Sequence, residues 1–498
     1  NTPNGYDFFE VSIRQWLSES IFQKNTIIDE FDKCFQINIE SKLLFSDHHL
    51  SHAASAFFPS PFKNSAIITM DGVGELTTTS ISVGEGNVIK NLKEIQFPHS
   101  LGLFYASFTD FLGFKVNSGE YKVMGLAPYG KDKYSNLIED NLISIHQDGS
   151  FELNMEYFDY CIKPQMIGKK IEDLFKLKKR NPESQIKSVH MDIAASLQNI
   201  TDKIVLNLAR ETRKSSTQNK LCLSGGVALN CVTNGKLLKA NIFDKIWIQP
   251  ASGDAGGSIG AALSVYHLME KKNRLRNNVN TDSMNGTYLG PSYTQSQIEF
   301  DLNRLGAKFT TLKEKELLSK TAKFLSEGKA IGWFQGRSEF GPRSLGARSI
   351  LADPRSQNMQ SSLNLKVKFR ESFRPFAPTI LEEEAEKWFK IKGTSPYMLI
   401  VCEIEENIKI TDHGEKNNTL GFQKLKVKRS KIPAVTHVDY SARVQTINKN
   451  TNKKYYNLIR EFFKLTGCPI LVNTSFNVRG EPIVLTPKDA FKCFMGTE

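Results

Sequence analysis

The sequence lacks several features that mark whole classes of protein. Its 498 residues contain no run of about 18 apolar residues, so we expect no membrane span and no membrane partner. No basic-then-apolar leader opens the sequence, so we expect a cytoplasmic rather than a secreted protein. The seven cysteines are odd in number and include no Cys-x-x-Cys pair, which favours reduced thiols and excludes a zinc ribbon.

The charge balance does not select a partner by itself. The formal net charge is +12, from 65 Lys and Arg against 53 Asp and Glu. Two explanations fit this positive excess equally well: a Lys-rich solvated surface, or binding of anionic ligands, nucleotides or nucleic acid. Only local clustering can separate these explanations. The runs at 176–180 and 424–431 contain little besides lysine, arginine and apolar residues, and we expect them to be solvated surface.

Short apolar stretches that alternate with amphipathic stretches predict an α/β fold. Residues 64–69 form an apolar strand, and a hairpin that turns at Gly84–Asn87 follows. A polar stretch at 273–286 predicts a linker between a first domain, 1–272, and a second domain, 287–498. Two domains suit the length, since single cores rarely grow past about 250–300 residues.

The stretch "FSDHHLSHAASAFF" predicts a helix capped by Ser46 or Asp47. His48 and His52 are four positions apart and face the same way, the spacing by which one helix offers two imidazoles to one metal ion. The helix N-terminus disfavours imidazolium, so both rings stay able to bind metal. A lone histidine pair is nevertheless more often structural, and two ligands do not close a site. His49 points about 100° away, so we expect it to pack or to orient the pair.

Three glycine-rich loops follow predicted strands: "TMDGVGEL", "LSGGVALN" and "ASGDAGGSIG". Glycine lets backbone N–H groups approach phosphate, and a helix N-terminus favours negative charge. Each loop alone is a weak signal, but three together are stronger. Asp254 in the third loop is either a helix cap or a third metal ligand beside His48 and His52.

Motifs along nearly the whole chain carry a family resemblance. "HHLSHAASAF", "MDGVGE", "NSGEYKVMGLAPYG", "SGGVALN" and "SGDAGGSIGAA" occur in that order, followed by "GRSEFGPRSLGARSILADPR", "FRESFRPFAPTILEE", "THVDYSARVQT" and "CPILVNTSFNVRGEPIV". This set resembles the nodulation-type and antibiotic O-carbamoyltransferases. The resemblance implies an actin/sugar-kinase-like (ASKHA) domain followed by a YrdC-like α/β domain. That family begins with a strand and a first phosphate loop, so we expect a first domain without its N-terminal strands, in a fragment of a longer enzyme.

The resemblance also implies an activity. The second domain would make carbamoyl-adenylate from carbamoyl phosphate and ATP with Mg²⁺. The first domain, holding Fe²⁺ or another divalent metal as a Lewis acid, would pass the carbamoyl group to a hydroxyl of a small molecule, such as a sugar or natural product. The implied metal ligands are His48, His52 and Asp254. The implied carbamoyl-nucleotide residues of the first domain are Asp71, Gly72, Gly225, Gly226 and Asn230, with Glu120, Tyr121 and Lys122 nearby.

Arginines in the second half alternate with Gly, Ser and Phe rather than with Glu, which favours an anion pocket over a solvated basic face. ATP and carbamoyl phosphate together bring about five or six negative charges, which positioned cations neutralise. The expected cations are Arg337, Arg343, Arg348, Lys366, Lys368, Arg370, Arg374 and Arg443. His437, Asn473, Thr474 and Ser475 follow strand-like segments and either hold the carbamoyl group or nucleotide or are structural. The catalytic residues that we expect are His48, His52, Asp254, Arg343 and Arg374.

Three other functions compete with this interpretation. A tRNA-modifying threonylcarbamoyl enzyme joins the same two fold types and suits the positive charge, but the motif wording favours the small-molecule family, so we expect no nucleic-acid partner. Hydrogenase-maturation carbamoyltransferases need Cys-x-x-Cys fingers, which this sequence lacks. An actin-like ATP-binding scaffold without enzymatic activity is the third alternative.

Overall fold

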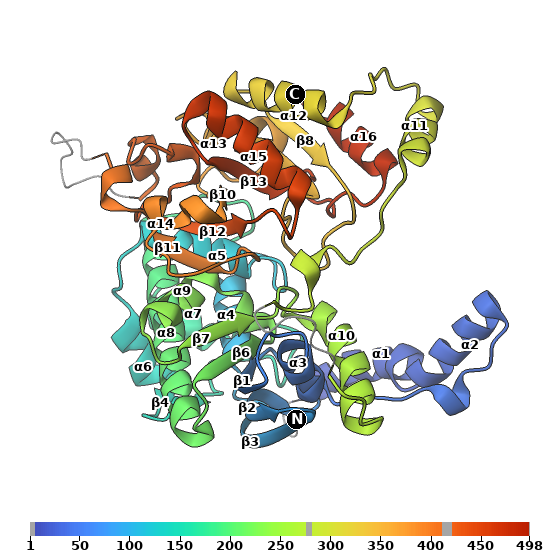
Figure 1. The fold of residues 1–498 in the computed structure, drawn as a ribbon. Coiled ribbons are helices and arrows are strands. Elements are labelled where there is room, and N and C mark those ends of the chain that lie inside the picture. Colours follow the sequence, from blue (N-terminus) through green and yellow to red (C-terminus); the bar gives the residue numbers. More distant parts are fainter. Residues whose placement is uncertain (1–4, 275–280, 411–420, 498) are drawn as a thin grey trace.

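A computed structural model of the protein describes residues 5–274, 281–410 and 421–497 (Figure 1). The two halves of the chain each contain one main sheet with helices around it, so the predicted mixed α/β fold is confirmed. Whether the halves are ASKHA and YrdC-like domains stays a prediction. The predicted linker falls partly on 275–280, which lie outside the described residues.

The first sheet has the strand order β3-β2-β1-β6-β7. The central strand β1 is buried along six of its seven residues, pairs antiparallel with β2 and pairs parallel with β6. Strands β2 and β3 form the predicted hairpin, which turns at Gly86 and Asn87. The strands are β1 Asn64–Met70, β2 Thr77–Glu85, β3 Val88–Gln96, β6 Lys220–Ser224 and β7 Lys245–Ile248; β4 Ile143–Ile145 and β5 Phe151–Leu153 form a separate pair.

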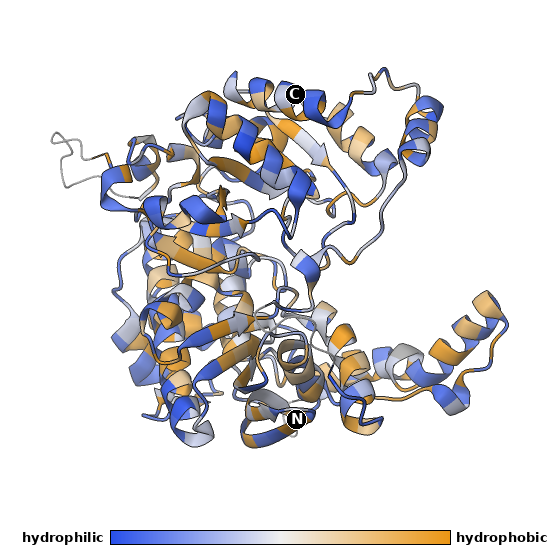
Figure 2. Ribbon diagram, in the orientation of Figure 1, coloured by the Kyte–Doolittle hydropathy of each residue, from blue (hydrophilic) through white to orange (hydrophobic). Residues whose placement is uncertain are grey.

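The helices of the first half cover this sheet, and apolar residues follow its strands and the helix faces against them (Figure 2). They are α3 His48–Phe57, α4 Leu101–Phe111, α5 Glu120–Leu126, α6 Ser135–Asn141, α7 Lys169–Phe175, α8 Ser188–Ser216, α9 Cys231–Lys239 and α10 Asp254–Ser264. Helices α1 Tyr6–Gln15 and α2 Gln23–Phe35 form an arm that projects from the body (Figure 1).

The second sheet has six strands in the order β11-β12-β10-β13-β9-β8. They are β8 Ile331–Phe334, β9 Arg348–Ala352, β10 Ala377–Leu381, β11 Ile400–Glu403, β12 Ser441–Ile447 and β13 Ile470–Ser475. The helices of this half are α11 Gln295–Arg304, α12 Glu314–Ser326, α13 Met359–Ser362, α14 Ala385–Trp388, α15 Lys453–Thr466 and α16 Pro487–Met495.

The two halves pack directly against each other. The hydrophobic core of the first half also includes Phe373 and Leu399 of the second. Helix α9 lies against β11 so closely that a Cβ at Gly235 would be 1.9 Å from the Val401 carbonyl oxygen.

The domain limits proposed from the sequence stay a prediction. Among the described residues, no helix combines the length and apolarity needed to cross a membrane.

Candidate functional site

Four side chains from three parts of the first half converge on one point. The Nε2 atoms of His48 and His52 lie 3.0 Å apart. The Oδ2 atom of Asp71 is 2.8 Å from the first nitrogen and 3.1 Å from the second. The Oδ1 atom of Asp254 is 3.7 Å and 3.6 Å from the same two nitrogens. The structure therefore brings the three predicted metal ligands together and adds Asp71, for which the family resemblance implied a place in the carbamoyl-nucleotide pocket.

Local structure explains this convergence. Helix α3 begins at His48, so the two histidines occupy one face of its first two turns. Asp71 follows directly after β1 and accepts a hydrogen bond from the Gly226 N–H, 2.8 Å away, through its other oxygen. Asp254 is the first residue of α10, and Gly253 is the cap of that helix, so the Asp254 carboxylate is not used as the cap.

Close packing of α10 on α3 holds Asp254 near the histidines. A Cβ at Gly260 would lie 1.7 Å from the Ser51 carbonyl oxygen, so only glycine allows the two helices to approach this closely. Position 257, three residues earlier on α10, is also glycine, but no heavy atom of the described residues lies within 4 Å of its would-be Cβ. Gly260 therefore sets the helix spacing, whereas Gly257 does not.

The charges of the cluster are mutually stabilised. Burial raises the pKa of Asp71, but hydrogen bonds from His48 and His52 outweigh it and hold that pKa below its ordinary range. Burial lowers the pKa of His52, but hydrogen bonds to Asp254 and Asp71 raise it to about 9. The two carboxylates thus favour imidazolium at His52 at neutral pH, against the expectation that the helix N-terminus disfavours it, and a bound metal would displace that proton. Burial lowers the pKa of His49 to about 4, and its Nδ1 lies 2.6 Å from the Thr69 hydroxyl. His49 thus packs beside the cluster, as the sequence predicted.

The donor set suits a divalent metal. Each of the four residues offers one ligand atom, and these two imidazole nitrogens and two carboxylate oxygens all lie within 4.8 Å of one another. Mixed nitrogen and oxygen ligands suit Fe²⁺, Zn²⁺ and similar ions. Asp254 is 81% exposed at its side chain whereas His52 is 1% exposed, so the cluster is open on one side.

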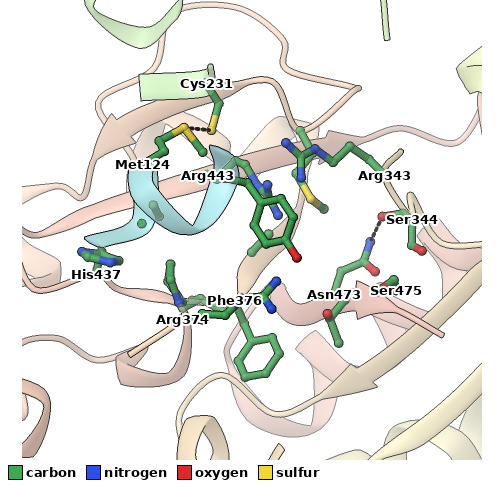
Figure 3. A pocket seen from close by; sticks show the side chains of 18 of the residues that line it. Met124, Cys231, Arg343, Ser344, Arg374, Phe376, His437, Arg443, Asn473 and Ser475 are labelled. Atoms are coloured by element: carbon green, nitrogen blue, oxygen red, sulfur yellow. Dashed lines mark hydrogen bonds between the residues drawn. The ribbon is translucent and has the colours of Figure 1, made fainter. Parts of the chain in front are cut away.

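A second feature is a pocket of about 310 Å³ between the two halves (Figure 3). Helices α5 and α9 of the first half form one wall, and strand ends and loops of the second half form the rest. The predicted residues that line it are Tyr121, Arg343, Lys368, Arg370, Arg374, His437, Arg443, Asn473, Thr474 and Ser475. Asp439 is the one carboxylate among the described residues that line it. We call this feature the anion pocket.

The cations of the anion pocket are close enough to destabilise one another. Burial, followed by the neighbouring Arg443 guanidinium, lowers the pKa of Arg343 to about 9. Burial and Arg374 likewise lower the pKa of Arg370 to about 9. Arg374 lies with its guanidinium carbon 4.6 Å from the ring centre of Tyr121, which comes from the first half. A bound polyanion would relieve this repulsion.

Several buried polar atoms around the anion pocket have no hydrogen-bond partner among the described residues. They are Arg343 Nε, Ser344 Oγ, Asn473 Oδ1 and both ring nitrogens of His437. Native proteins satisfy most buried polar groups, so such a gathering at one pocket indicates a ligand that completes them.

Lys368 has a structural task within this pocket. Its Nζ lies 2.7 Å and 3.1 Å from two oxygens of Ser475, and 2.8 Å and 2.6 Å from two oxygens of Asn477. The ammonium group therefore holds the turn that follows β13. Burial, together with Arg370 and Arg374, lowers the pKa of Lys368 to about 7.

Some predicted residues do not line the anion pocket. Arg348 is fully buried and donates to carbonyls that include those of Gln335 and Gly336, so its charge organises the loop. Arg337 donates to the Leu289 carbonyl instead. Glu120 is absent from the pocket because its carboxylate accepts backbone N–H groups at the start of its own helix.

The remaining predicted residues lie elsewhere in the first half or at its boundary. Lys122 makes an ion pair of 2.9 Å with Glu371 across the two halves. Asn230 accepts the Thr233 N–H as the cap of α9, and the Gly225 N–H donates to the Ser252 carbonyl. Gly72 follows Asp71, and its carbonyl accepts the Ser100 hydroxyl. Their predicted contacts with a nucleotide stay a prediction.

Five polar residues of the anion pocket were not predicted from the sequence: Ser344, Asp439, Ser441, Asn477 and Arg479. Arg479 stands beside a glycine in "NVRGEP", the same pattern that had singled out the other arginines. Asp439 lies two residues after His437, and its Oδ1 is 3.6 Å from the His437 Nδ1. Both residues lie in motifs that carry the family resemblance.

Comparison with known proteins identifies similar sequences over most of the chain. A family model described as "Carbamoyltransferase N-terminus" matches residues 2–263, and one described as "Carbamoyltransferase C-terminus" matches residues 322–498. An uncharacterized protein of Synechocystis sp. is 51% identical over 100% of this chain and 81% of its own length. Nodulation protein NolO of Bradyrhizobium diazoefficiens is 39% identical over 91% of this chain and 76% of its own.

Structural similarity adds little to these matches. The crystal structure of full-length HypF in the phosphate- and nucleotide-bound form is 16% identical and covers 45% of this chain and 43% of its own, with a TM-score of 0.28.

Proposed function

Because the chain belongs to the carbamoyltransferase family and is a carbamoyltransferase, we propose that it uses ATP to transfer the carbamoyl group of carbamoyl phosphate to a hydroxyl group of a small molecule. Carbamoyl-adenylate is the intermediate of this proposal. The observation that carries it is the anion pocket, where five arginines and one lysine of the described residues surround about 310 Å³ between the two halves.

The anion pocket suits the formation of the adenylate. Carbamoyl phosphate reacts with water and gives carbamate and inorganic phosphate. A carbamate oxygen then attacks the α-phosphorus of ATP, the bond to the β-phosphate oxygen breaks, and pyrophosphate leaves. Arg343, Arg374 and Arg443 bind and orient the phosphate groups and neutralise the charge that develops, since guanidinium is suited to paired contacts with phosphate oxygens. Mg²⁺ accompanies ATP in this step.

The cluster of His48, His52, Asp71 and Asp254 suits the transfer step. These four residues would hold Fe²⁺ or another divalent metal, which when bound would supply Lewis-acid polarisation of the carbamoyl group. Glu75 accepts the backbone N–H of His48 at 3.0 Å and fixes the start of α3. The exposed side of the cluster at Asp254 leaves room for a small-molecule acceptor, such as a sugar or another hydroxyl-bearing natural product.

All seven cysteines are unpaired thiols, which supports a reducing, cytoplasmic setting.

The test separates the two steps. The protein is supplied with ATP, labelled carbamoyl phosphate and a mixture of hydroxyl-bearing acceptors, and pyrophosphate and labelled product are measured. His52→Ala is expected to abolish acceptor labelling and to spare pyrophosphate release, because His52 lies in the cluster and not in the anion pocket. His146→Ala, at an exposed histidine outside both sites, is the matched control. Acceptor labelling that survives in His52→Ala would refute the assignment of the cluster.

A further inference from the structure

Asn473 presents an unused hydrogen-bond acceptor at the anion pocket. It lies in β13, lines the pocket (Figure 3) and is 1% exposed. Its side-chain oxygen Oδ1 has no hydrogen-bond partner in the part of the chain that the structure describes. A buried amide oxygen without a donor is destabilising, so this atom calls for a donor from a ligand.

Two backbone carbonyls determine which way the amide of Asn473 faces. The Leu345 carbonyl accepts the Nε2 group of Gln445 at 2.9 Å, so the Gln445 Oε1 faces the other way. That oxygen accepts the Thr379 hydroxyl at 2.6 Å and the Asn473 Nδ2 group at 2.9 Å. The Ser344 carbonyl accepts the same Nδ2 group at 3.1 Å. Carbonyl oxygens only accept, so both amides are oriented and the Asn473 Oδ1 is left over.

The chemistry of the neighbouring groups indicates which kind of ligand group donates to the Asn473 Oδ1. Ser344 follows Arg343, and Ser475 is held by Lys368, so Asn473 lies among the cations of the pocket. Arginine and lysine only donate, and phosphate and carbamate oxygens accept from them. The amino group of a carbamoyl ligand is an N–H donor that lies directly beside a phosphate. The adenine amino group, by contrast, lies at the far end of the nucleotide from the phosphates.

We propose that Asn473 Oδ1 accepts a hydrogen bond from the amino group of the carbamoyl substrate and thereby selects it over acyl phosphates of the same shape. This inference rests on the proposed function, and it assigns substrate discrimination to one oriented atom. Thr379 and Gln445 are positioning residues, because the Thr379 hydroxyl, at 3.1 Å, and the Gln445 Oε1 both accept the Nδ2 group of Asn473. A site built around a hydrogen bond rejects the analogue that lacks the donor, since a buried acceptor is then left unpaired.

The test compares carbamoyl phosphate with acetyl phosphate, in which a methyl group replaces the amino group. In the wild-type protein, pyrophosphate release gives the KM for carbamoyl phosphate, and inhibition of that release gives the Ki for acetyl phosphate. We expect the acetyl phosphate Ki to exceed the carbamoyl phosphate KM by about 10- to 100-fold, the effect of one unpaired buried acceptor. A wild-type ratio near one would overturn the proposal without any variant.

Variants then assign the discrimination to Asn473. Asn473→Leu keeps the shape and removes the oxygen, and it should lower the ratio to less than about 3-fold. Thr379→Val, which removes the donor to Gln445, should lower the ratio by a smaller factor. Ser475→Ala is the matched control in the same strand, and it should weaken the binding of both acyl phosphates by the same factor, which leaves the ratio unchanged. Circular dichroism checks that each variant is folded.

The outcomes distinguish a failure of this inference from a failure of the proposed function. If the wild-type protein releases no pyrophosphate from ATP with carbamoyl phosphate, the proposed function itself is wrong. If it does so but Asn473→Leu keeps the full ratio, the inference about Asn473 is wrong. If Asn473→Leu raises the KM for ATP and leaves the ratio unchanged, the oxygen binds a ribose hydroxyl, which also overturns the inference.

Discussion

The Nε2 atom of His48 lies 2.8 Å from the Oδ2 atom of Asp71, 23 positions further along the chain. This contact joins the first turn of α3 to the end of β1. It places a second carboxylate beside the histidine pair, so the metal site that we propose has four protein ligands rather than three.

Asp71→Asn should weaken metal binding while leaving the fold intact. The amide keeps the size of the side chain but loses the negative charge that a divalent metal favours. We expect the affinity for Fe²⁺ to fall by at least 10- to 100-fold, because even residues one step removed from a metal can contribute that much. Metal titration monitored by calorimetry measures it, and Asp148→Asn in the β4–β5 turn is the control. Equal affinities in wild type and Asp71→Asn would exclude Asp71 as a ligand.

Removing the metal should separate the two steps without any mutation. Dialysis against a chelator is expected to abolish carbamoylation of the acceptor and to spare pyrophosphate release from ATP, provided that Mg²⁺ is restored for the nucleotide. Adding back Fe²⁺ should then restore acceptor carbamoylation. If chelation leaves acceptor labelling at its full rate, the transfer step does not need the cluster.

Gly260→Ala should disturb the cluster from a distance, and Gly257→Ala should not. The added methyl group at position 260 would meet the Ser51 carbonyl at 1.7 Å, which forces α10 away from α3 and costs about 1–3 kcal/mol of stability. At position 257 the methyl group meets no atom of the described chain within 4 Å, so alanine should stabilise the helix by up to about 1 kcal/mol. Melting temperatures measure the difference. The two variants behaving alike would contradict the packing of α10 on α3.

Arg343→Ala should impair binding in the anion pocket, and Arg337→Ala should have little effect. Both arginines belong to "GRSEFGPRSLGARS", but only Arg343 lines the pocket. Losing a hydrogen bond to a charged phosphate should raise the KM for ATP or carbamoyl phosphate by about 10- to 100-fold. Arg337→Ala should change either KM by less than about 3-fold. Equal changes in KM for the two variants would show that Arg343 has no special role in binding ATP or carbamoyl phosphate.

The buried ammonium of Lys368 should make stability depend on pH. Burial, Arg370 and Arg374 lower its pKa to about 7 from 10.5, with a small opposing effect of Cys493. Between these values the unfolded chain holds the proton and the folded chain releases it, so stability should rise with pH. We expect the melting temperature of the wild type to rise between pH 7 and pH 9 relative to that of Lys368→Met. Parallel pH profiles for the two proteins would contradict this.

The sequence predicted those parts of the site that depend on local geometry. The spacing of His48 and His52 determines that they share a helix face, because the α-helical period is 3.6 residues. Alternation of arginine with glycine selected the segments that line the anion pocket, although it could not separate Arg343 from Arg348.

Tertiary structure decided which of the candidate residues meet. Arg343 and Arg348 have similar neighbours in sequence, but β9 buries Arg348 against backbone carbonyls while Arg343 remains at the anion pocket. Asp71 joined the histidines because β1 ends beside α3, and Tyr121 joined the anion pocket because the two halves pack together. Side-chain spacing along one helix is a property of the local backbone. Contacts between distant segments depend on how sheets and helices pack, which no local pattern specifies.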